Sequence, residues 1–261
     1  MEIRPLLTHE LEQAAAWWHE QYELFLGRLR WSARTPYALA LGAVRWDEVE
    51  ACGTAVVSGG TGRITALRGQ RPQEREAVAQ ALIAALERAG CTGQVVHAAP
   101  ADAAFWGALG FAAGTPLLRY TGGRFLQATW DGIEILEPAQ RLGVIHLDRK
   151  ASGEERSTLL LEHEYMGRAC TERGTVRGFT LALLGEGLIV ADDPDLGLEL
   201  QRWHFPIQEH VLLWEGNSAH HHLTARGYRA EPHGLRMTRG TVPPHRPALI
   251  FAEPFDRVEV G

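Results

Sequence analysis

The sequence predicts a mixed α/β fold in two tandem domains, each a mostly antiparallel mixed sheet flanked by helices. Apolar residues switch repeatedly between the two-residue spacing of strands and the three-to-four-residue spacing of helices. The order of these segments in residues 1–124 returns loosely in residues 125–261. A chain of 261 residues is long enough for two domains of ordinary size. We therefore place the domain boundary between residues 124 and 125, just after the Gly-Gly break at 122–123.

The first domain is expected to alternate short strands with three helices. Thr8 is a suitable N-cap for the first helix, and short turns connect three antiparallel strands in the middle of the domain. Gly90 follows the central helix, where a glycine commonly ends a helix. In chain order the expected elements are strand 2–6, helix 9–25, strands 37–45, 49–58 and 63–67, helix 73–88, strand 95–98, helix 101–109 and strand 115–120.

The second domain is expected to repeat this outline. Pro194 opens a helix for which Asp193 is the N-cap. A Gly-aromatic pair at 227–228 precedes a later strand, as the pair at 110–111 does in the first domain. In chain order the expected elements are strand 133–136, helix 154–172, strands 177–183 and 188–190, helix 194–203, strand 210–214, helix 218–225 and strands 235–239 and 248–252.

Charge and cysteine content exclude several classes of partner and site. The formal net charge is −6, and no basic block is present, which argues against a nucleic acid or an anionic membrane as partner. Cys52, Cys91 and Cys170 lie far apart, so we expect neither a disulfide scaffold nor a metal site. The sequence has no signal-peptide pattern and no apolar run that could cross a bilayer. These features are typical of a cytoplasmic protein.

Residues 62–111 carry the strongest functional signal. An apolar strand at 64–67 leads through an arginine-rich turn into the long helix; a second strand, a short helix and a Gly-Phe pair follow. The start of a helix offers free backbone N–H groups and the positive end of the helix dipole, which suit an anion such as a phosphate. The alternative is an ordinary helix start covered with solvated charges.

This order of elements, closed by Leu109, Gly110 and Phe111, resembles the acetyl-CoA-binding half of the GNAT superfamily of N-acetyltransferases. The segments LDRKASGEERSTLL, RGFTLALLGEGLIVADD and EGNSAHHHLTARGY resemble the C-terminal GNAT-like domain of the two-domain YitH type. The resemblance implies acetyl-CoA as co-substrate. It also implies direct transfer of the acetyl group to an amine of a small molecule or peptide.

The phosphate turn of the superfamily resembles Arg/Gln-x-x-Gly-x-Gly/Ala, and this sequence departs from it. Alignment on Leu82 places Glu74, Ala77 and Ala79 at the three marked positions, so an acid replaces the basic residue. A shift of one residue places Arg75 in the basic position instead, and both registers stay open. Backbone N–H groups near residues 77–80 are the expected pyrophosphate donors. The resemblance thus implies these cofactor-binding residues: Leu67, Gly69, Arg75, Ala77, Val78, Ala79, Gln80 and Trp106.

The corresponding helix of the second domain begins among three acids, Asp192, Asp193 and Asp195. These carboxylates satisfy the helix dipole themselves and would repel a phosphate. We therefore expect that the second domain does not bind CoA.

Acetyl transfer needs a base for the ammonium group and an acid for the departing thiolate. A tyrosine four residues before the Gly-Phe pair often supplies the acid in the family, but this position is Trp106, and the same offset in the second domain gives Leu223. His97 is the candidate general base, because histidine titrates near neutral pH and its strand diverges from its neighbour around the thioester in the family. The alternative is a hydrogen-bonded strand histidine. Glu48 and Glu50 are further candidates for the base.

Two functions are consistent with these residues. The first is a two-domain N-acetyltransferase in which the first domain binds acetyl-CoA and the second shapes the acceptor site or a homodimer. The second is a degenerate, non-catalytic GNAT-like module that binds a ligand or a partner, which Glu74, Ala77 and Trp106 favour. No motif identifies the acceptor.

Overall fold

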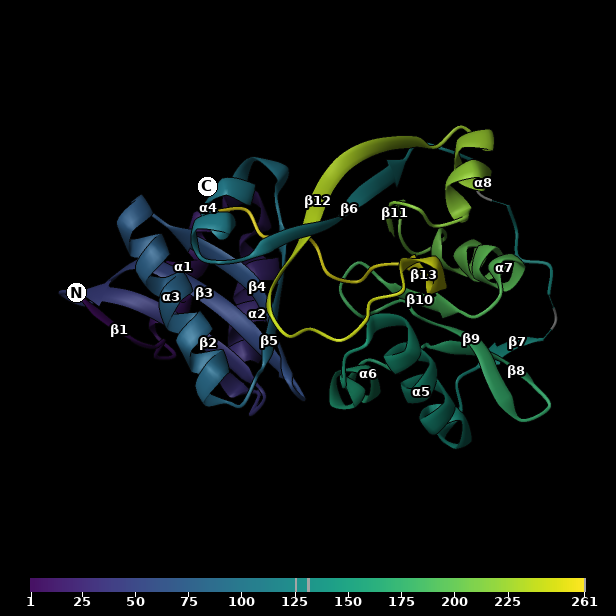
Figure 1. Cartoon of the computed structure of the whole chain (residues 1–261), viewed down its shortest axis with the longest axis horizontal. Coiled ribbons are helices and arrows are strands. Elements are labelled where there is room, and N and C mark those ends of the chain that lie inside the picture. Colours follow the sequence, from purple (N-terminus) through teal and green to yellow (C-terminus); the bar gives the residue numbers. More distant parts are fainter. Residues whose placement is uncertain (125, 131, 261) are drawn as a thin grey trace. The chain divides into compact units, whose positions relative to one another are not determined.

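The computed structural model describes residues 1–124, 126–130 and 132–260, except for the side chains of residues 18–20. Figure 1 shows the strands and helices of this part of the chain. The strands are β1 (Glu2–Pro5), β2 (Ala38–Arg45), β3 (Glu48–Ser58), β4 (Thr61–Gly69), β5 (Gly93–Ala98), β6 (Ala112–Thr121), β7 (Ile133–Ile135), β8 (Arg168–Glu172), β9 (Thr175–Leu181), β10 (Leu188–Ala191), β11 (His210–Trp214), β12 (Arg229–Gly240) and β13 (Ile250–Ala252). The α-helices are α1 (Glu10–Ala15), α2 (Tyr22–Arg34), α3 (Pro72–Arg88), α4 (Ala103–Ala108), α5 (Arg141–Ser152), α6 (Ser157–Glu162), α7 (Pro194–His204) and α8 (Ala219–Ala225).

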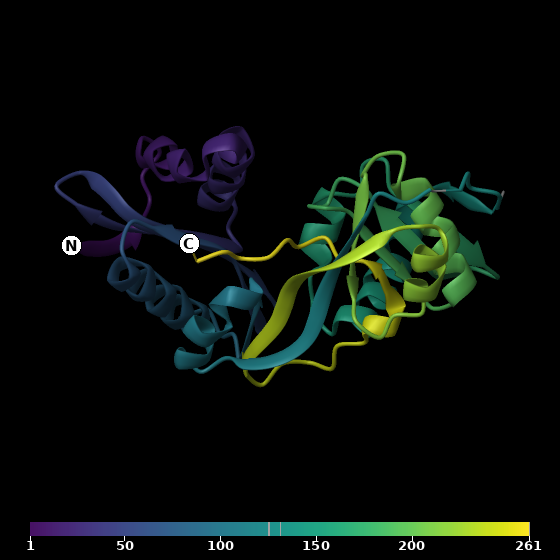
Figure 2. The ribbon, with the colours of Figure 1, turned by 90° about the horizontal axis from the view of Figure 1, so that it is seen from above.

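Strands β1 to β5 form a sheet with helices on both faces. β1, β2, β3 and β4 pair antiparallel in chain order, α3 follows, and β5 pairs parallel with β4. Helices α1 and α2 cover one face of this sheet and α3 covers the other (Figure 2). Each face has its own buried apolar cluster. Leu29 and Cys52 belong to the cluster with α1 and α2, whereas Leu67 and Leu82 belong to the cluster with α3.

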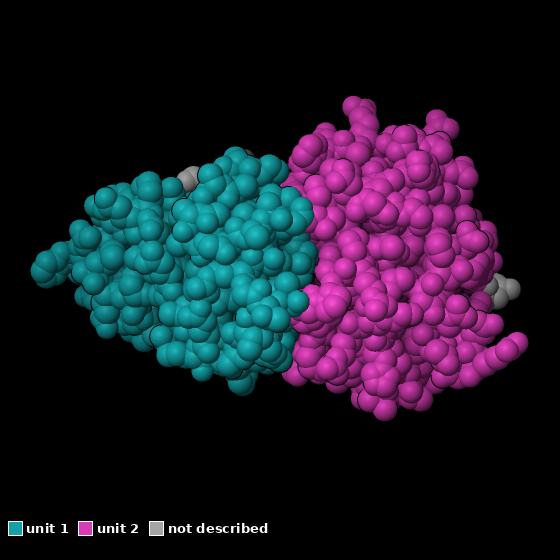
Figure 3. All heavy atoms as spheres, viewed as in Figure 1, with its two compact units in different colours: residues 1–114, 235–242, 257–261 teal, residues 115–234, 243–256 magenta. Residues whose placement is uncertain are grey.

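The chain divides into two compact units (Figure 3). Unit 1 comprises Met1–Gly114, Leu235–Val242 and Arg257–Gly261, and unit 2 comprises Thr115–Gly234 and Pro243–Asp256. The expected boundary between residues 124 and 125 differs from this division, because it lies inside unit 2 and because unit 1 takes in two later segments of the chain. Residues 235–240 of β12, in unit 1, pair antiparallel with β5. The larger sheet has the strand order β1-β2-β3-β4-β5-β12-β6-β11.

Unit 2 contains a second, five-stranded antiparallel sheet with the order β13-β10-β9-β8-β7. Within the same unit, β6 and β11 pair antiparallel. Helix α7 follows β10, as α3 follows β4 in unit 1. The carboxylate of Asp193 caps α7 by accepting hydrogen bonds from the N–H groups of Asp195 (3.0 Å) and Leu196 (3.1 Å), which confirms the expected N-cap.

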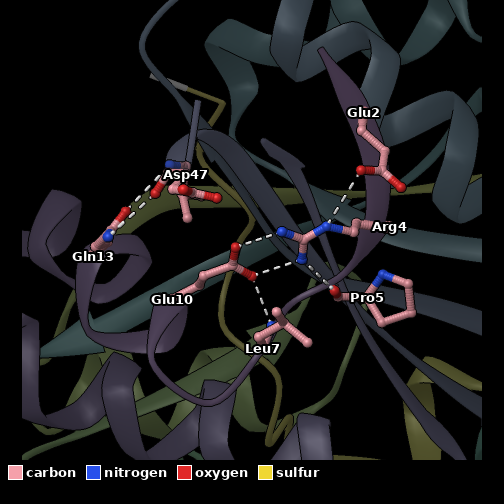
Figure 4. Close-up of polar contacts among 8 residues, drawn as sticks. Glu2, Arg4, Pro5, Leu7, Glu10, Gln13 and Asp47 are labelled. Carbon is pink, nitrogen blue, oxygen red and sulfur yellow. Dashed lines mark hydrogen bonds and ion pairs between the residues drawn. The ribbon is translucent and has the colours of Figure 1, made fainter. Parts of the chain in front are cut away.

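An ion pair fixes the first strand to the first helix. The guanidinium of Arg4 on β1 donates hydrogen bonds to both carboxylate oxygens of Glu10, at 2.8 and 2.6 Å (Figure 4). The same carboxylate accepts the N–H group of Leu7 at 2.7 Å. Glu10 is only 1% exposed, so this bidentate pair is one of the stronger kind. The Arg4 guanidinium lowers the pKa of the Glu10 carboxyl.

The expected helix over residues 9–25 is interrupted. α1 ends at Ala15, a 3₁₀ segment (Ala16–Gln21) follows, and α2 runs from Tyr22 to Arg34 through residues expected as a loop. His9, not Thr8, is the N-cap, and its side chain makes no capping hydrogen bond. Glu10 satisfies the N–H group of Leu7 before the helix instead.

The expected helix over residues 154–172 is wrong. The structure has α5 before this range and places α6 and β8 within it. Gly153 adopts a φ of +76° and ends α5 as a left-handed C-cap, and Met166 with a φ of +59° turns the chain before β8. Leu159 and Leu160 belong to α6. The positive φ of this turn lies at Met166 and not at the adjacent Gly167, so apolar spacing alone does not indicate where α6 ends.

Candidate functional site

The site expected from the sequence lies where β4 and β5 stop pairing. The two parallel strands pair as far as Ile64 opposite Val96. Beyond that point β4 continues beside β3 as far as Gly69, and β5 continues beside β12 as far as Ala98. The facing edges therefore carry backbone N–H and C=O groups that the two strands do not satisfy mutually. Such an edge can bind an extended chain that carries amide groups.

Residues 257–260 cover part of this edge. The N–H group of Val258 donates to the carbonyl of His97 at 2.6 Å, and the N–H group of Ala99 donates to the carbonyl of Val258 at 3.0 Å. Because β12 occupies the opposite edge of β5 along its whole length, Val258 lies on the edge that β4 uses earlier in the strand. The sequence interpretation missed this segment. Its alternating Arg-Val-Glu-Val pattern is the signal that could have found it.

Helix α3 begins earlier than the superfamily pattern implies. Arg71 is its N-cap, Pro72 is the first helical residue, and the N–H group of Arg75 already donates to the carbonyl of Arg71 at 3.2 Å. Ala77, Val78, Ala79 and Gln80 therefore lie inside the helix, where backbone N–H groups bond to carbonyls one turn earlier. The expectation that these four residues supply free donors is wrong. The free N–H groups at this helix start are those of Gln73 and Glu74.

Two buried acids hold the arginines around this helix start. Glu50 and Glu74 are 8% and 3% exposed. The guanidinium of Arg71 lies 3.0 Å from Glu50 and 3.1 Å from Glu74, and that of Arg45 lies 3.3 Å from Glu50. These arginines are thus paired with the protein's own carboxylates. A phosphate would have to share or displace these pairs.

The remaining basic residues near the helix start also have protein partners. Arg75 donates to the carbonyl of Gly69 at 3.3 Å, and Arg68 lies 2.9 Å from Glu259. A Cβ atom at Gly69 would lie 2.8 Å from Cγ of Arg75 and 2.6 Å from Cβ of Ala51, so glycine is required where these residues approach the strand. Arg75 and Gly69, both expected at the cofactor, are therefore in contact with each other.

Solved structures resemble this architecture over nearly the whole chain. A candidate acetyltransferase from Pyrococcus horikoshii has a TM-score of 0.78 at 16% identity, covering 96% of this chain and 93% of that one. A tandem GNAT protein from the clavulanic acid biosynthesis pathway has a TM-score of 0.56 at 16% identity, covering 93% and 99%. The chain has the tandem GNAT fold. A GCN5-related N-acetyltransferase from Sphaerobacter thermophilus, with a TM-score of 0.56 at 13% identity over 95% and 98% of the two chains, shares this GNAT fold.

At the level of sequence, no family model and no curated protein matches the chain. The likeness to GNAT proteins therefore concerns the fold, and the chemistry depends on the residues of this chain.

In this GNAT fold, Trp106 is a core residue. It is fully buried and makes edge-to-face contacts with Phe105 and Phe111, at ring-centroid distances of 5.2 and 5.4 Å. Its indole Nε1 has no hydrogen-bond partner among the described residues. The expectation that the Trp106 side chain lines the cofactor is not consistent with this burial. The side chain of Trp106, which projects from α4, instead fills the apolar core of unit 1.

Leu67, Val78 and Ala79 are core residues of unit 1 as well. Their exposed fractions are 1%, 0% and 0%, and all three belong to the apolar cluster between α3 and the sheet. Only their backbones could meet a cofactor. Gln80 is exposed and donates to Glu76 at 3.0 Å.

His97 lies on β5 at the point where the strands part, and it is 2% exposed. Its Nε2 atom is 2.7 Å from the guanidinium of Arg63. Because a guanidinium can only donate, Nε2 is the acceptor and carries no proton. The lone pair that a general base would use is therefore occupied by Arg63. This contact favours the interpretation of His97 as a hydrogen-bonded strand histidine.

Within residues 1–124, 126–130 and 132–260, no group of three or more His, Cys, Asp or Glu side chains is arranged to hold a metal ion. In the same part of the chain, no helix is both long enough and apolar enough to cross a bilayer.

Proposed function

We propose that unit 1 of this GNAT fold binds acetyl-CoA and transfers its acetyl group directly to an amine of a small molecule or peptide. The observation that carries the proposal is the parting of β4 and β5 after Ile64 and Val96. The arm of CoA contains two amide groups in an extended chain. These groups match the N–H and C=O groups that β4 and β5 no longer share with each other beyond that point.

The pyrophosphate would lie at the start of α3. The free N–H groups of Gln73 and Glu74 and the helix dipole favour an anion there. Arg71 is half exposed, at 52% of its side chain, and can turn from Glu74 toward a phosphate. The buried carboxylates of Glu50 and Glu74 oppose this binding, so the affinity is expected to be modest.

The transfer itself needs few side chains. The lone pair of the neutral amine forms the C–N bond to the acetyl carbonyl carbon, the C–S bond breaks, and its electron pair leaves with the sulfur as thiolate. The proton lost by the amine passes to water, and the thiolate takes a proton from water. A thiol with a pKa of about 8.5 gives a tolerable leaving group at neutral pH. The absence of a tyrosine at position 106 therefore slows the reaction without preventing it.

We propose that His97 does not take the proton of the amine. With the 2.7 Å hydrogen bond in place, His97 instead orients Arg63 and the end of β5. We propose that unit 2 does not bind CoA. The support for this is that Asp193 already satisfies the first N–H groups of α7.

Isothermal titration with acetyl-CoA tests binding, and release of free thiol with a panel of primary amines tests transfer. We expect saturable binding with one site per chain, and amine-dependent thiol release. Desulfo-CoA is the matched control, since it keeps the arm and pyrophosphate but has no thioester. No binding at millimolar acetyl-CoA would contradict the proposal.

A second candidate is a non-catalytic module that binds CoA or an extended peptide at the same edge. The observations that favour it are the complete burial of Trp106 and the occupied Nε2 atom of His97. In that case acetyl-CoA and desulfo-CoA would bind with equal affinity, and no amine in the panel would increase thiol release above the rate of hydrolysis.

A further inference from the structure

Residues 257–260 are seated on unit 1 by more than the two backbone hydrogen bonds of Val258. The carboxylate of Glu259 lies 2.9 Å from Arg68 on β4, and the N–H group of Val260 donates to Asp102 at 2.8 Å. Val258 and Val260 are each 3% exposed and belong to the apolar cluster of unit 1. The segment thus contacts β4 through a side chain and β5 through its backbone.

The position of Val258 is defined by the two edges of β5. One edge pairs with β12 from Gly93 to Ala98, and the other pairs with β4 only as far as Val96. The carbonyl of His97 and the N–H group of Ala99 lie on that second edge, where the N–H group of Val258 donates to the first and the carbonyl of Val258 accepts from the second. Residues 257–260 therefore act as a short parallel strand where β4 has turned away.

Unit 2 also has a late segment of the chain, β13, seated beside the strand that precedes its helix α7. There β10 precedes α7 as β4 precedes α3, and β13 pairs with β10. The N–H group of Glu253, directly after β13, donates to the carbonyl of Leu212 on β11 at 2.9 Å. Phe251 of β13 is fully buried, and a Cβ atom on Gly197 of α7 would lie 2.4 Å from its ring. In unit 2 the inserted strand is thus part of the core.

The attachment in unit 1 is shorter, although Val258 and Val260 belong to the apolar core of that unit. A single bridge, Ala98 with Val258, holds the backbone, and the ion pair between Arg68 and Glu259 is partly exposed, at 24% and 42%. Exposed ion pairs contribute little to stability. A segment held in this way can leave its edge while the rest of unit 1 stays folded.

We propose that residues 257–260 are an intramolecular competitor for the acyl-CoA arm in unit 1. This rests on the proposed function of the same site. The segment pairs with the edge of β5 and contacts Arg68 on β4, and the proposed function places the arm between these two strands, so the two cannot be bound together. The apparent affinity for the cofactor is then lowered by the fraction of molecules in which the segment is released. If that fraction is about one in ten, the dissociation constant rises about tenfold.

The test compares CoA binding by the whole chain with binding by two altered chains. Val258→Pro removes the N–H group that donates to His97, and Val258→Ile is its control because it keeps that donor and the apolar side chain. A chain that ends at Asp256 removes the segment altogether. We expect the proline variant and the shortened chain to bind CoA about tenfold more tightly than the whole chain, and the isoleucine variant to match it.

A second measurement covers the case in which these changes disturb folding. Glu259→Arg places like charges at Arg68 without altering the backbone donors, and it should also tighten CoA binding. The peptide Arg-Val-Glu-Val-Gly, added to the shortened chain, should weaken CoA binding. Equal affinities for all chains would overturn the competition while leaving the proposed function standing. Absence of CoA binding by every chain, with melting curves that show folded protein, would overturn both.

Discussion

The guanidinium of Arg63 and Nε2 of His97 lie 2.7 Å apart, and both side chains are buried in unit 1. Arginine has no acceptor atom, so the hydrogen bond runs from Arg63 to His97 and places the imidazole proton on Nδ1. The residue that the sequence offers as a general base is therefore held in a fixed tautomer by a neighbouring strand. Its role can be decided by mutation.

We predict that His97→Gln lowers kcat by less than about tenfold, whereas removal of a general base typically costs about 100-fold or more. The amide oxygen of glutamine can still accept from Arg63, so the strand end stays in place. The measurement is kcat and KM for thiol release across pH 6 to 9. His146→Gln, on the exposed side of α5, is the control. A loss beyond 100-fold together with a vanished acid limb of the pH profile would show that His97 is the base.

Glu74 is predicted to weaken cofactor binding. Its buried carboxylate stands at the start of α3 beside the free N–H groups and holds Arg71 at 3.1 Å. Glu74→Gln removes one negative charge and leaves Arg71 paired with Glu50 alone, so the dissociation constant for CoA should fall about fivefold, as expected from about 1 kcal/mol of charge interaction. The gain should shrink in high salt. Glu76→Gln, on the same helix but exposed, should leave the affinity unchanged; if both variants behave alike, the pyrophosphate does not lie at this helix start.

Trp106 is predicted to contribute to stability and not to cofactor contact. Trp106→Ala should lower the free energy of unfolding by about 3–5 kcal/mol, because it empties a fully buried site. Trp106→Phe should cost less, since it keeps the aromatic contacts and removes an Nε1 atom that has no hydrogen-bond partner among the described residues. Urea unfolding measures both, with Trp46→Phe at a 91% exposed position as control. Loss of CoA binding by Trp106→Phe at unchanged stability would place the indole in the cofactor site.

The Arg4–Glu10 pair is predicted to make stability depend on acid pH. The pKa of Glu10 is lowered in the folded chain, chiefly by its hydrogen bond with Arg4, so the pair stabilises the fold above the unfolded pKa of about 4.3. This contribution is lost as the pH falls through the lower, folded pKa. Glu10→Gln should lower the free energy of unfolding at pH 7 by about 1.5 kcal/mol, and the difference should vanish near pH 2. Glu12→Gln, whose carboxylate is 62% exposed, is the control, and a pH-independent difference would contradict the pairing.

Local signals in the sequence predicted a large share of the fold. The strand–helix–strand succession of β4, α3 and β5 follows from apolar spacing, and the Asp193 cap of α7 follows from side-chain chemistry at a helix start. The start of α3 at Pro72 lies within one residue of the expected helix over 73–88, and proline at the first helical position is a local signal for it. The alignment with the phosphate turn failed, because this start places residues 77–80 inside the helix.

Long-range pairing accounts for what the sequence could not show. Val258 is far from Ala98 in the chain, and its alternating neighbours are compatible with any edge strand. Arg63 and His97 are brought together only because β4 and β5 are parallel neighbours. The local spacing of residues predicts neither pairing, and both pairings affect whether this edge can bind a cofactor.

The exchange rate of the Val258 amide hydrogen, with and without saturating acetyl-CoA, tests the central claim most directly. The account predicts that this hydrogen is protected in the free chain by its bond to the carbonyl of His97 and exchanges at least about tenfold faster when acetyl-CoA is bound. The amides between β5 and β12 should keep their protection in both states. Unchanged protection of Val258 in the acetyl-CoA complex would contradict the account, because the segment and the cofactor would then be bound at the same time.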